Sequence, residues 1–154
     1  IHTFHESVRL QGHAPKNADE AQYALAFPVA ALVARGQLGA EEVTGAAIHA
    51  ADILDISQRI TIREAADLSA RFPEEILSRV TVQLKDGTAV SSRTTAAKGD
   101  PANPLSAAEF IDKYRRFSEG SLGVPLSRAL EQGVAGLAEQ PDCEGFLKLL
   151  LGPV

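Results

Sequence analysis

The sequence predicts an α+β fold, in which a small, mostly antiparallel sheet of about four strands packs against helices and is followed by C-terminal helices. Alternating apolar and polar residues are typical of half-buried strands, whereas apolar residues three or four positions apart are typical of amphipathic helices. The alternating segments end before residue 98, and only helical patterns follow. We therefore expect an α+β domain over residues 1–97, and a connector with C-terminal helices over residues 98–154.

The chain opens with an imperfect alternation over residues 1–10 (IHTFHESVRL), which predicts a strand. A loop over 11–17 follows. The next segment, 20–35, is a predicted helix, with Asp19 as the expected N-cap and Gly36 as the expected stop.

The apolar side chains of this predicted helix are numerous enough to suggest burial on most sides. Its main apolar face is formed by Tyr23, Phe27, Ala30 and Ala34. Pro28 lies inside the pattern, and we expect it to kink the helix or to split it in two, because proline removes a backbone donor and crowds the preceding turn.

The middle of the chain alternates between short helical and extended patterns. Residues 40–49 and 51–58 predict helices, and Ile60-Thr61-Ile62 predicts a short strand. Residues 67–73 are expected to form a loop that ends at a proline.

A hairpin is the clearest local prediction. Residues 79–84 alternate, with Val80, Val82 and Leu84 on one face. Asp86-Gly87 is a strong hairpin-turn signal, and residues 88–95 return as the partner strand.

Three helices are expected after the turn-rich connector 98–104. Ser106 and Glu109 have the spacing of a capping box, which predicts a helix from residue 106 to about Phe117. Residues 125–138 and 142–151 predict two more helices, each with a proline at or just before its start.

Composition excludes several classes of protein. The 154 residues carry a formal net charge of −5, which argues against a nucleic-acid partner, and no apolar run is long enough for a membrane span. The single cysteine, Cys143, excludes an intrachain disulfide and a cysteine-rich zinc site, and fits a reducing, cytoplasmic compartment. The chain has no methionine and opens directly in a predicted strand, so we interpret it as a piece of a longer protein.

Imidazoles and a carboxylate are concentrated near the N-terminus, at His2, His5, Glu6 and His13. Such groups bind zinc or iron, but in a strand His2 and His5 would point to opposite faces, so we expect no metal site. The alternative is that they face a cleft or solvent, where a histidine can still transfer protons near neutral pH.

Other charged residues have competing interpretations. The pairs Glu41-Glu42 and Glu74-Glu75 are expected to offset helix dipoles rather than to act as acid and base. Three arginines, Arg63, Arg71 and Arg79, have the chemistry to bind a carboxylate substrate, although solvated arginines are common. Neither a P-loop nor a G-x-S-x-G elbow is present, so these patterns alone do not reveal a reaction.

Five features in order resemble the C-terminal region of the MmgE/PrpD family. They are the E-A-Q-Y helix entry followed by a buried apolar helix and a glycine, the I-T-I strand, the L-K-D-G hairpin, the K-G-D-P-x-N-P-L-S connector, and a following helix that ends in K-Y. Together they span roughly residues 1–120. The family includes 2-methylcitrate dehydratase, iminodisuccinate epimerase and cis-aconitate decarboxylase.

This resemblance implies a two-domain parent protein, in which a helical N-terminal domain of the same chain carries most catalytic residues and a smaller α+β domain closes over a cleft. It implies a small di- or tricarboxylate substrate, no cofactor, and proton transfer next to a carboxylate. The catalytic residues of the family have no matching positions here. We expect the cleft-facing residues of this chain around its first strand and the loop after it, namely His2, His5, Glu6, Arg9 and His13.

Three functions remain open from the sequence. The chain is the C-terminal fragment of a cofactor-independent lyase or isomerase that is inactive alone, or a module that binds small carboxylates, or a dimerisation domain. We also expect a homo-oligomer, because the terminal helices carry more apolar residues than a small sheet can bury.

Overall fold

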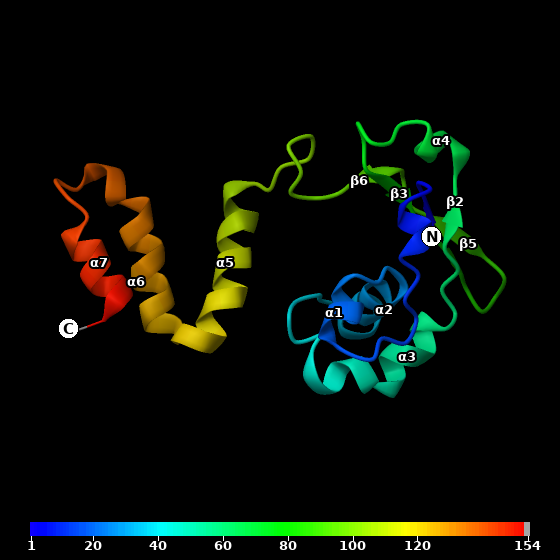
Figure 1. Ribbon diagram of the computed structural model, residues 1–154, viewed down its shortest axis with the longest axis horizontal. Coiled ribbons are helices and arrows are strands. Elements are labelled where there is room, and N and C mark those ends of the chain that lie inside the picture. The colour runs from blue at the N-terminus through cyan, green and yellow to red at the C-terminus, as the bar shows by residue number, and fades with distance from the viewer. Residues whose placement is uncertain (153–154) are drawn as a thin grey trace. The chain divides into compact units, whose positions relative to one another are not determined.

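The computed structural model of the chain describes residues 1–152. The chain forms two compact units, one from Ile1 to Pro104 and one that begins at Leu105. The first contains a sheet, a ribbon and short helices, and the second is helical (Figure 1). The predicted α+β class and the predicted C-terminal helices are therefore confirmed.

A four-stranded sheet organises the N-terminal unit. Its order is β2-β1-β3-β6, in which the strands are β1 (His2–Thr3), β2 (Arg63–Glu64), β3 (Leu77–Arg79) and β6 (Thr95–Ala96). β1 pairs with β2 in parallel, whereas the β1–β3 and β3–β6 pairs are antiparallel. The sheet is thus mostly antiparallel, as predicted.

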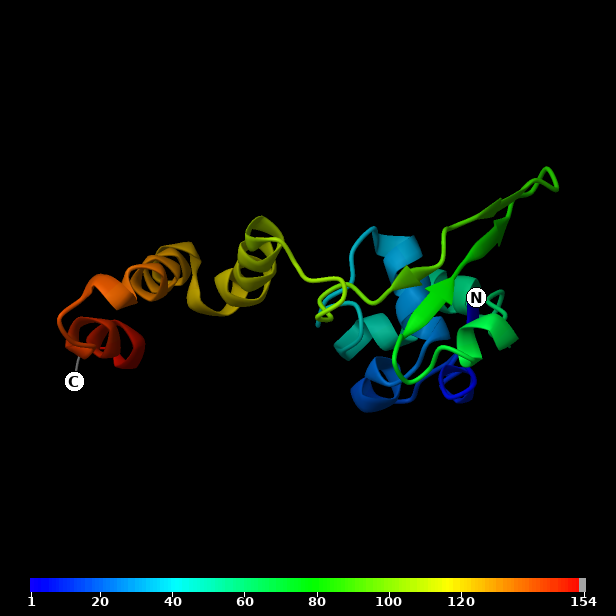
Figure 2. The same cartoon turned by 90° about the horizontal axis from the view of Figure 1, so that it is seen from above.

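The predicted hairpin is confirmed, but each of its arms is interrupted. Past β3 the chain continues as β4 (Thr81–Gln83), and β5 (Ala89–Ser91) returns toward β6. The β4–β5 ribbon projects beyond the rest of the N-terminal unit (Figure 2). At its tip Gly87 has a φ of 88°, which a turn of this kind requires and which glycine adopts without strain.

The predicted helix over 20–35 is in fact two helices, α1 (Ala18–Gln22) and α2 (Ala26–Arg35). Asn17 is the N-cap of α1, since its side chain accepts the Glu20 amide at 2.8 Å, and the prediction of Asp19 as the cap is wrong. Pro28 lies in the first turn of α2, where an amide has no intrahelical partner to lose. The break therefore precedes the proline instead of coinciding with it.

A distant loop explains where α2 begins. The amides of residues 25, 26 and 27 donate to the carbonyls of residues 10, 11 and 12, at 2.7, 2.9 and 3.2 Å in that order. These contacts satisfy donors that a helix N-terminus leaves without intrahelical partners. At the other end Gly36 caps α2 with a φ of 74°, as expected.

The main core of the N-terminal unit lies between α2 and α3 (Ala51–Ser57). Its buried side chains are Ala21, Phe27, Ala30, Ala31, Val43, Ile48 and Ile53. Tyr23 and Val33 are 77% and 65% exposed. The expectation that the helical segment is buried on most sides is therefore wrong, because only one face of α2 meets α3.

The first predicted strand is much shorter than residues 1–10. β1 ends at Thr3, and a 3-10 helix, η1 (Ser7–Arg9), follows. The His5 amide donates to the Ser69 hydroxyl at 3.0 Å, and the Phe4 ring stacks on Phe72. These contacts with a segment more than sixty residues away turn the chain out of the sheet.

Three other predictions are corrected in the middle of the chain. Over 40–49 only η2 (Gly45–His49) is helical, and it is a 3-10 helix. Strand pairing begins at Arg63 rather than in 60–62, with the Arg63 amide donating to the Ile1 carbonyl at 2.8 Å. The predicted loop 67–73 starts inside a short helix, α4 (Ala66–Ser69), whose Leu68 is buried against Leu77 and Ala65.

The C-terminal unit contains the expected helices, α5 (Ala107–Leu122), α6 (Val124–Ala135) and α7 (Glu144–Leu151), with a short 3-10 helix, η3 (Leu137–Glu139), before the last. The predicted capping box is confirmed at the start of α5. The Ser106 hydroxyl accepts the Glu109 amide, and the Glu109 carboxylate accepts the Ser106 amide at 2.9 Å.

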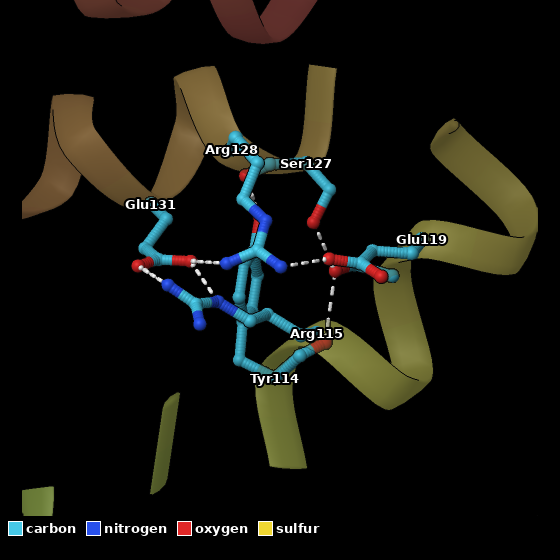
Figure 3. A network of polar contacts seen from close by, with 7 residues as sticks. Tyr114, Arg115, Glu119, Ser127, Arg128 and Glu131 are labelled. Atoms are coloured by element: carbon cyan, nitrogen blue, oxygen red, sulfur yellow. Dashed lines mark hydrogen bonds and ion pairs between the residues drawn. The ribbon is translucent and has the colours of Figure 1, made fainter. Parts of the chain in front are cut away.

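Polar contacts join α5 to α6 (Figure 3). Arg115 donates two hydrogen bonds to Glu131, at 2.8 and 2.7 Å, and lowers the pKa of that carboxyl below its ordinary value. The Tyr114 hydroxyl donates to the carbonyl of the fully buried Ser127 at 3.0 Å. The two helices are thus held in register by directed contacts as well as by packing.

Large apolar side chains remain exposed on the C-terminal unit. They are Phe110, Phe117, Leu122, Val124, Leu126, Val134, Leu147, Leu150 and Leu151. No helix within residues 1–152 is both long enough and apolar enough to cross a membrane.

Candidate functional site

A hollow of about 670 Å³ opens on the N-terminal unit between α2, the end of α3, the start of the sheet and β4. Its apolar lining consists of Ile1, Val29, Val33, Ile56, Ile60, Val80 and Val82. Its polar lining consists of His2, Arg59, Thr61, Arg63, Thr81 and Gln83.

The charge of this hollow is one-sided. Arg59 and Arg63 both line it, together with His2, and the described residues of its lining include neither an aspartate nor a glutamate. The chain as a whole has 20 acidic and 15 basic residues, so the positive charge of the hollow is opposite to the net charge of the chain. An anion is the ligand that such a lining favours.

The three arginines that the sequence suggested as carboxylate binders differ in whether an acidic side chain already binds them. Arg71 donates to Glu75 at 2.5 and 2.6 Å, and Arg79 donates to Asp67 at 2.7 and 3.0 Å. These hydrogen bonds lower the pKa of Glu75 and of Asp67 below the ordinary carboxyl values. Arg63 has no such partner within the described residues, and it alone of the three lines the hollow.

The five predicted cleft residues are not brought to one place. His2 lines the hollow with the two arginines. Glu6 and Arg9 line a second hollow of about 450 Å³, whose other lining residues are Phe4, Ser7 and Leu10. Within that second group Arg9 pairs with Glu6 at 3.3 Å.

The other two histidines of the predicted set, His5 and His13, have partners of their own. His5 stands edge-on to the Phe72 ring, with centroids 5.4 Å apart, and its Nε2 lies 3.6 Å from Glu6. His13 Nδ1 lies 2.7 Å from the Ser57 carbonyl, while the Ser57 hydroxyl donates to the His13 carbonyl at 2.8 Å. His13 therefore fastens its loop to the end of α3.

One member of each acidic pair has a structural contact, although neither pair lies in a first helical turn as the sequence suggested. The buried Glu42 carboxylate accepts the Gly39 amide at 2.8 Å and the Gln37 side chain at 2.7 Å. Glu75 is bound to Arg71. Within residues 1–152, no group of three or more histidine, cysteine, aspartate or glutamate side chains is arranged to hold a metal ion.

Sequence reasoning missed Arg59. Its available signal is the segment R-I-T-I-R, in which Arg59 and Arg63 bracket an apolar stretch. Only the packing of that stretch near α2 and β4 shows that the two arginines line one hollow.

Comparison with known proteins agrees with the resemblance read from the sequence. The family model described as the MmgE/PrpD C-terminal domain matches residues 1–137. Cis-aconitate decarboxylase of Mus musculus is 21% identical over 139 residues, which is 90% of this chain and 28% of that relative. Because the family model covers most of the sequence, the chain belongs to the MmgE/PrpD family, and residues 1–137 correspond to its C-terminal domain.

Proposed function

We propose that the chain is the C-terminal part of a cofactor-independent lyase or isomerase that acts on small di- or tricarboxylates. The observation that carries the proposal is the family match over residues 1–137. The name of the similar mouse protein, cis-aconitate decarboxylase, supports a carboxylate substrate. The cationic hollow of Arg59 and Arg63 supports the same class of ligand.

In this proposal the isolated chain is inactive and works with a helical N-terminal domain of the same longer protein. The chain spans 28% of the length of the curated relative. Proton transfer next to a carboxylate needs an acid and a base placed on the substrate together. Among the described residues that line the hollow are two arginines, and His2 is the one imidazole or carboxyl side chain.

Turnover assays test this proposal. The 154-residue chain and a longer product of the same open reading frame, extended upstream, are compared with cis-aconitate, methylcitrate and iminodisuccinate as substrates. We expect turnover of one of them by the longer product alone. Substantial activity of the short chain would contradict the need for a second domain, and no activity of a folded longer product would contradict the lyase or isomerase assignment.

A role in self-association is a second candidate, and it is compatible with the first. It is favoured by the exposed apolar side chains of the C-terminal unit, such as Phe110, Val134 and Leu151, which are 65%, 60% and 73% exposed. Exposed apolar groups of this kind are typical of protein interfaces. We propose a homo-oligomer, in a cytoplasmic setting that suits the exposed, unpaired Cys143.

A further inference from the structure

We propose that the hollow between α2, α3 and β4 is a carboxylate site, in which Arg59 and Arg63 hold two carboxylates of one small ligand and the valine and isoleucine side chains contact its hydrocarbon part. The choice of ligand class rests on the proposed function. The location of the site, in contrast, follows from the charges and contacts of the described residues.

The first argument is the lack of competing acids. In the N-terminal unit Arg9, Arg35, Arg71 and Arg79 each form an ion pair with a carboxylate. Arg59 and Arg63 form none within residues 1–152, and they line the same hollow. A guanidinium that lacks an internal carboxylate keeps its paired donors for an external one, in the bidentate geometry that suits the group.

The second argument is the orientation of Arg59. Its Nε donates to the Asp55 carbonyl at 3.0 Å, one turn earlier in the chain. This bond restrains the guanidinium plane at the end of α3, while the two terminal nitrogens keep their donors. A restrained donor loses less conformational freedom when a ligand binds, which raises affinity.

The third argument is the composition and size of the walls. Val29, Val33 and Ile56 face the hollow from the two helices, and Val80 and Val82 face it from the hairpin side. Gln83 and Thr61 add neutral polar groups. A volume of about 670 Å³ lies within the usual range for small-molecule sites, and apolar walls with a few charged groups are their usual lining.

Together these features select the chemistry of the ligand. Two guanidinium groups favour at least two carboxylates, and the apolar side chains favour a short carbon skeleton over a heavily hydroxylated one. Propane-1,2,3-tricarboxylate has both properties and is chemically stable, so it serves as the probe. Acetate, with one carboxylate, and inorganic phosphate, without a carbon skeleton, are the comparison ligands.

Isothermal titration calorimetry on the full 154-residue chain at physiological salt tests the proposal. We expect the tricarboxylate to bind more tightly than acetate or phosphate. Arg59→Gln and Arg63→Gln should each weaken its binding by roughly 10- to 100-fold, the loss typical of one charge-assisted hydrogen-bonding group. Arg93→Gln is the matched control, because Arg93 is an exposed arginine of the same unit that does not line the hollow.

A substitution in the apolar lining tests the location of the site while both arginines are kept. Val33 is 65% exposed, so Val33→Glu should leave the fold intact while it places a carboxylate in the hollow. We expect this variant to abolish binding, because its carboxylate competes for the guanidinium groups. Far-UV circular dichroism confirms that each variant is folded.

Three results would overturn the proposal: no binding of the tricarboxylate at millimolar concentration, equal binding of phosphate, or an equal loss in Arg93→Gln. The experiment measures binding without turnover, so its outcome is separate from the proposed activity. Turnover by the longer protein without binding to this hollow would overturn the site alone. Binding here without turnover by the longer protein would overturn the lyase or isomerase assignment alone.

Discussion

Gly12→Ala is expected to destabilise the N-terminal unit strongly, through a clash that the structure locates. Gly12 has a φ of 48°, and a methyl group added to it would lie 2.3 Å from the Ala24 Cβ and 3.1 Å from the Ala24 Cα. Its carbonyl also accepts the Phe27 amide at 3.2 Å, in the loop that precedes α2. The substitution therefore disturbs the start of the helix that carries Val29 and Val33.

Two costs add up at this position. A left-handed backbone costs a residue with a side chain about 1–2 kcal/mol. Crowding of a packed contact costs about 1–3 kcal/mol more, because the Ala24 methyl is attached directly to the backbone and cannot rotate away. We expect the free energy of unfolding to fall by about 2–5 kcal/mol in total.

Gly36→Ala is the matched control. Gly36 has a φ of 74°, but an added methyl group would have nothing within 4 Å. Only the backbone cost applies, so we expect a loss of about 1–2 kcal/mol.

Urea unfolding followed by far-UV circular dichroism measures both losses, since the chain has no tryptophan for fluorescence. In a double-mutant cycle, Ala24→Gly should restore part of the Gly12→Ala loss, because it removes the nearer of the two clashing atoms. Equal losses for Gly12→Ala and Gly36→Ala, with no recovery in the double variant, would refute the assignment of the extra cost to Ala24.

Three further predictions concern pH, a histidine and assembly. Arg115 lowers the pKa of Glu131 in the folded state. The ion pair therefore stabilises the fold fully above the pKa of an unfolded glutamate, about 4.3, and this stabilisation is lost as the pH falls through the lower pKa of the folded state. Melting temperatures from neutral to acidic pH should fall in that range, and Glu131→Gln should show a smaller fall; identical profiles would contradict the role of the pair. His13→Ala should lower the melting temperature more than His5→Ala, because His13 is half-buried on the Ser57 carbonyl while His5 is exposed; the reverse order in thermal denaturation would argue against the fastening role of His13. Sedimentation equilibrium should show self-association at micromolar concentration, and a single 16.3 kDa species would count against the apolar interface.

The sequence correctly predicted those structural features that are determined by residues close together in the chain. The capping box of Ser106 and Glu109, the turn at Gly87 and the helix stop at Gly36 all appear where the sequence placed them. In each case the residues that determine the backbone geometry lie within a few positions of one another, so a short sequence motif is enough to predict it. The order of such elements was also enough for the family resemblance that the comparison confirmed.

Distant contacts decided two of the predictions that failed. The length of the first strand depends on the Ser69 hydroxyl and the Phe72 ring, and the start of α2 depends on the carbonyls of residues 10–12. None of these partners lies in the segment whose pattern was read. The spacing of apolar residues within one segment cannot show where a contact from elsewhere in the chain ends a strand or caps a helix.

The candidate site was likewise predicted in part from the sequence and in part only from the tertiary structure. The sequence by itself determined which chemistry was available, namely imidazoles near the N-terminus and arginines able to bind carboxylates. Only the tertiary structure decided which of these groups share a hollow, because Glu75 and Asp67 occupy Arg71 and Arg79, whereas Arg63 faces the same space as Arg59. A guanidinium is chemically the same at every position. Glu75 reaches Arg71 from only four residues away, but whether Arg59 and Arg63 line one hollow depends on how α2, α3 and β4, which lie far apart in the sequence, pack together.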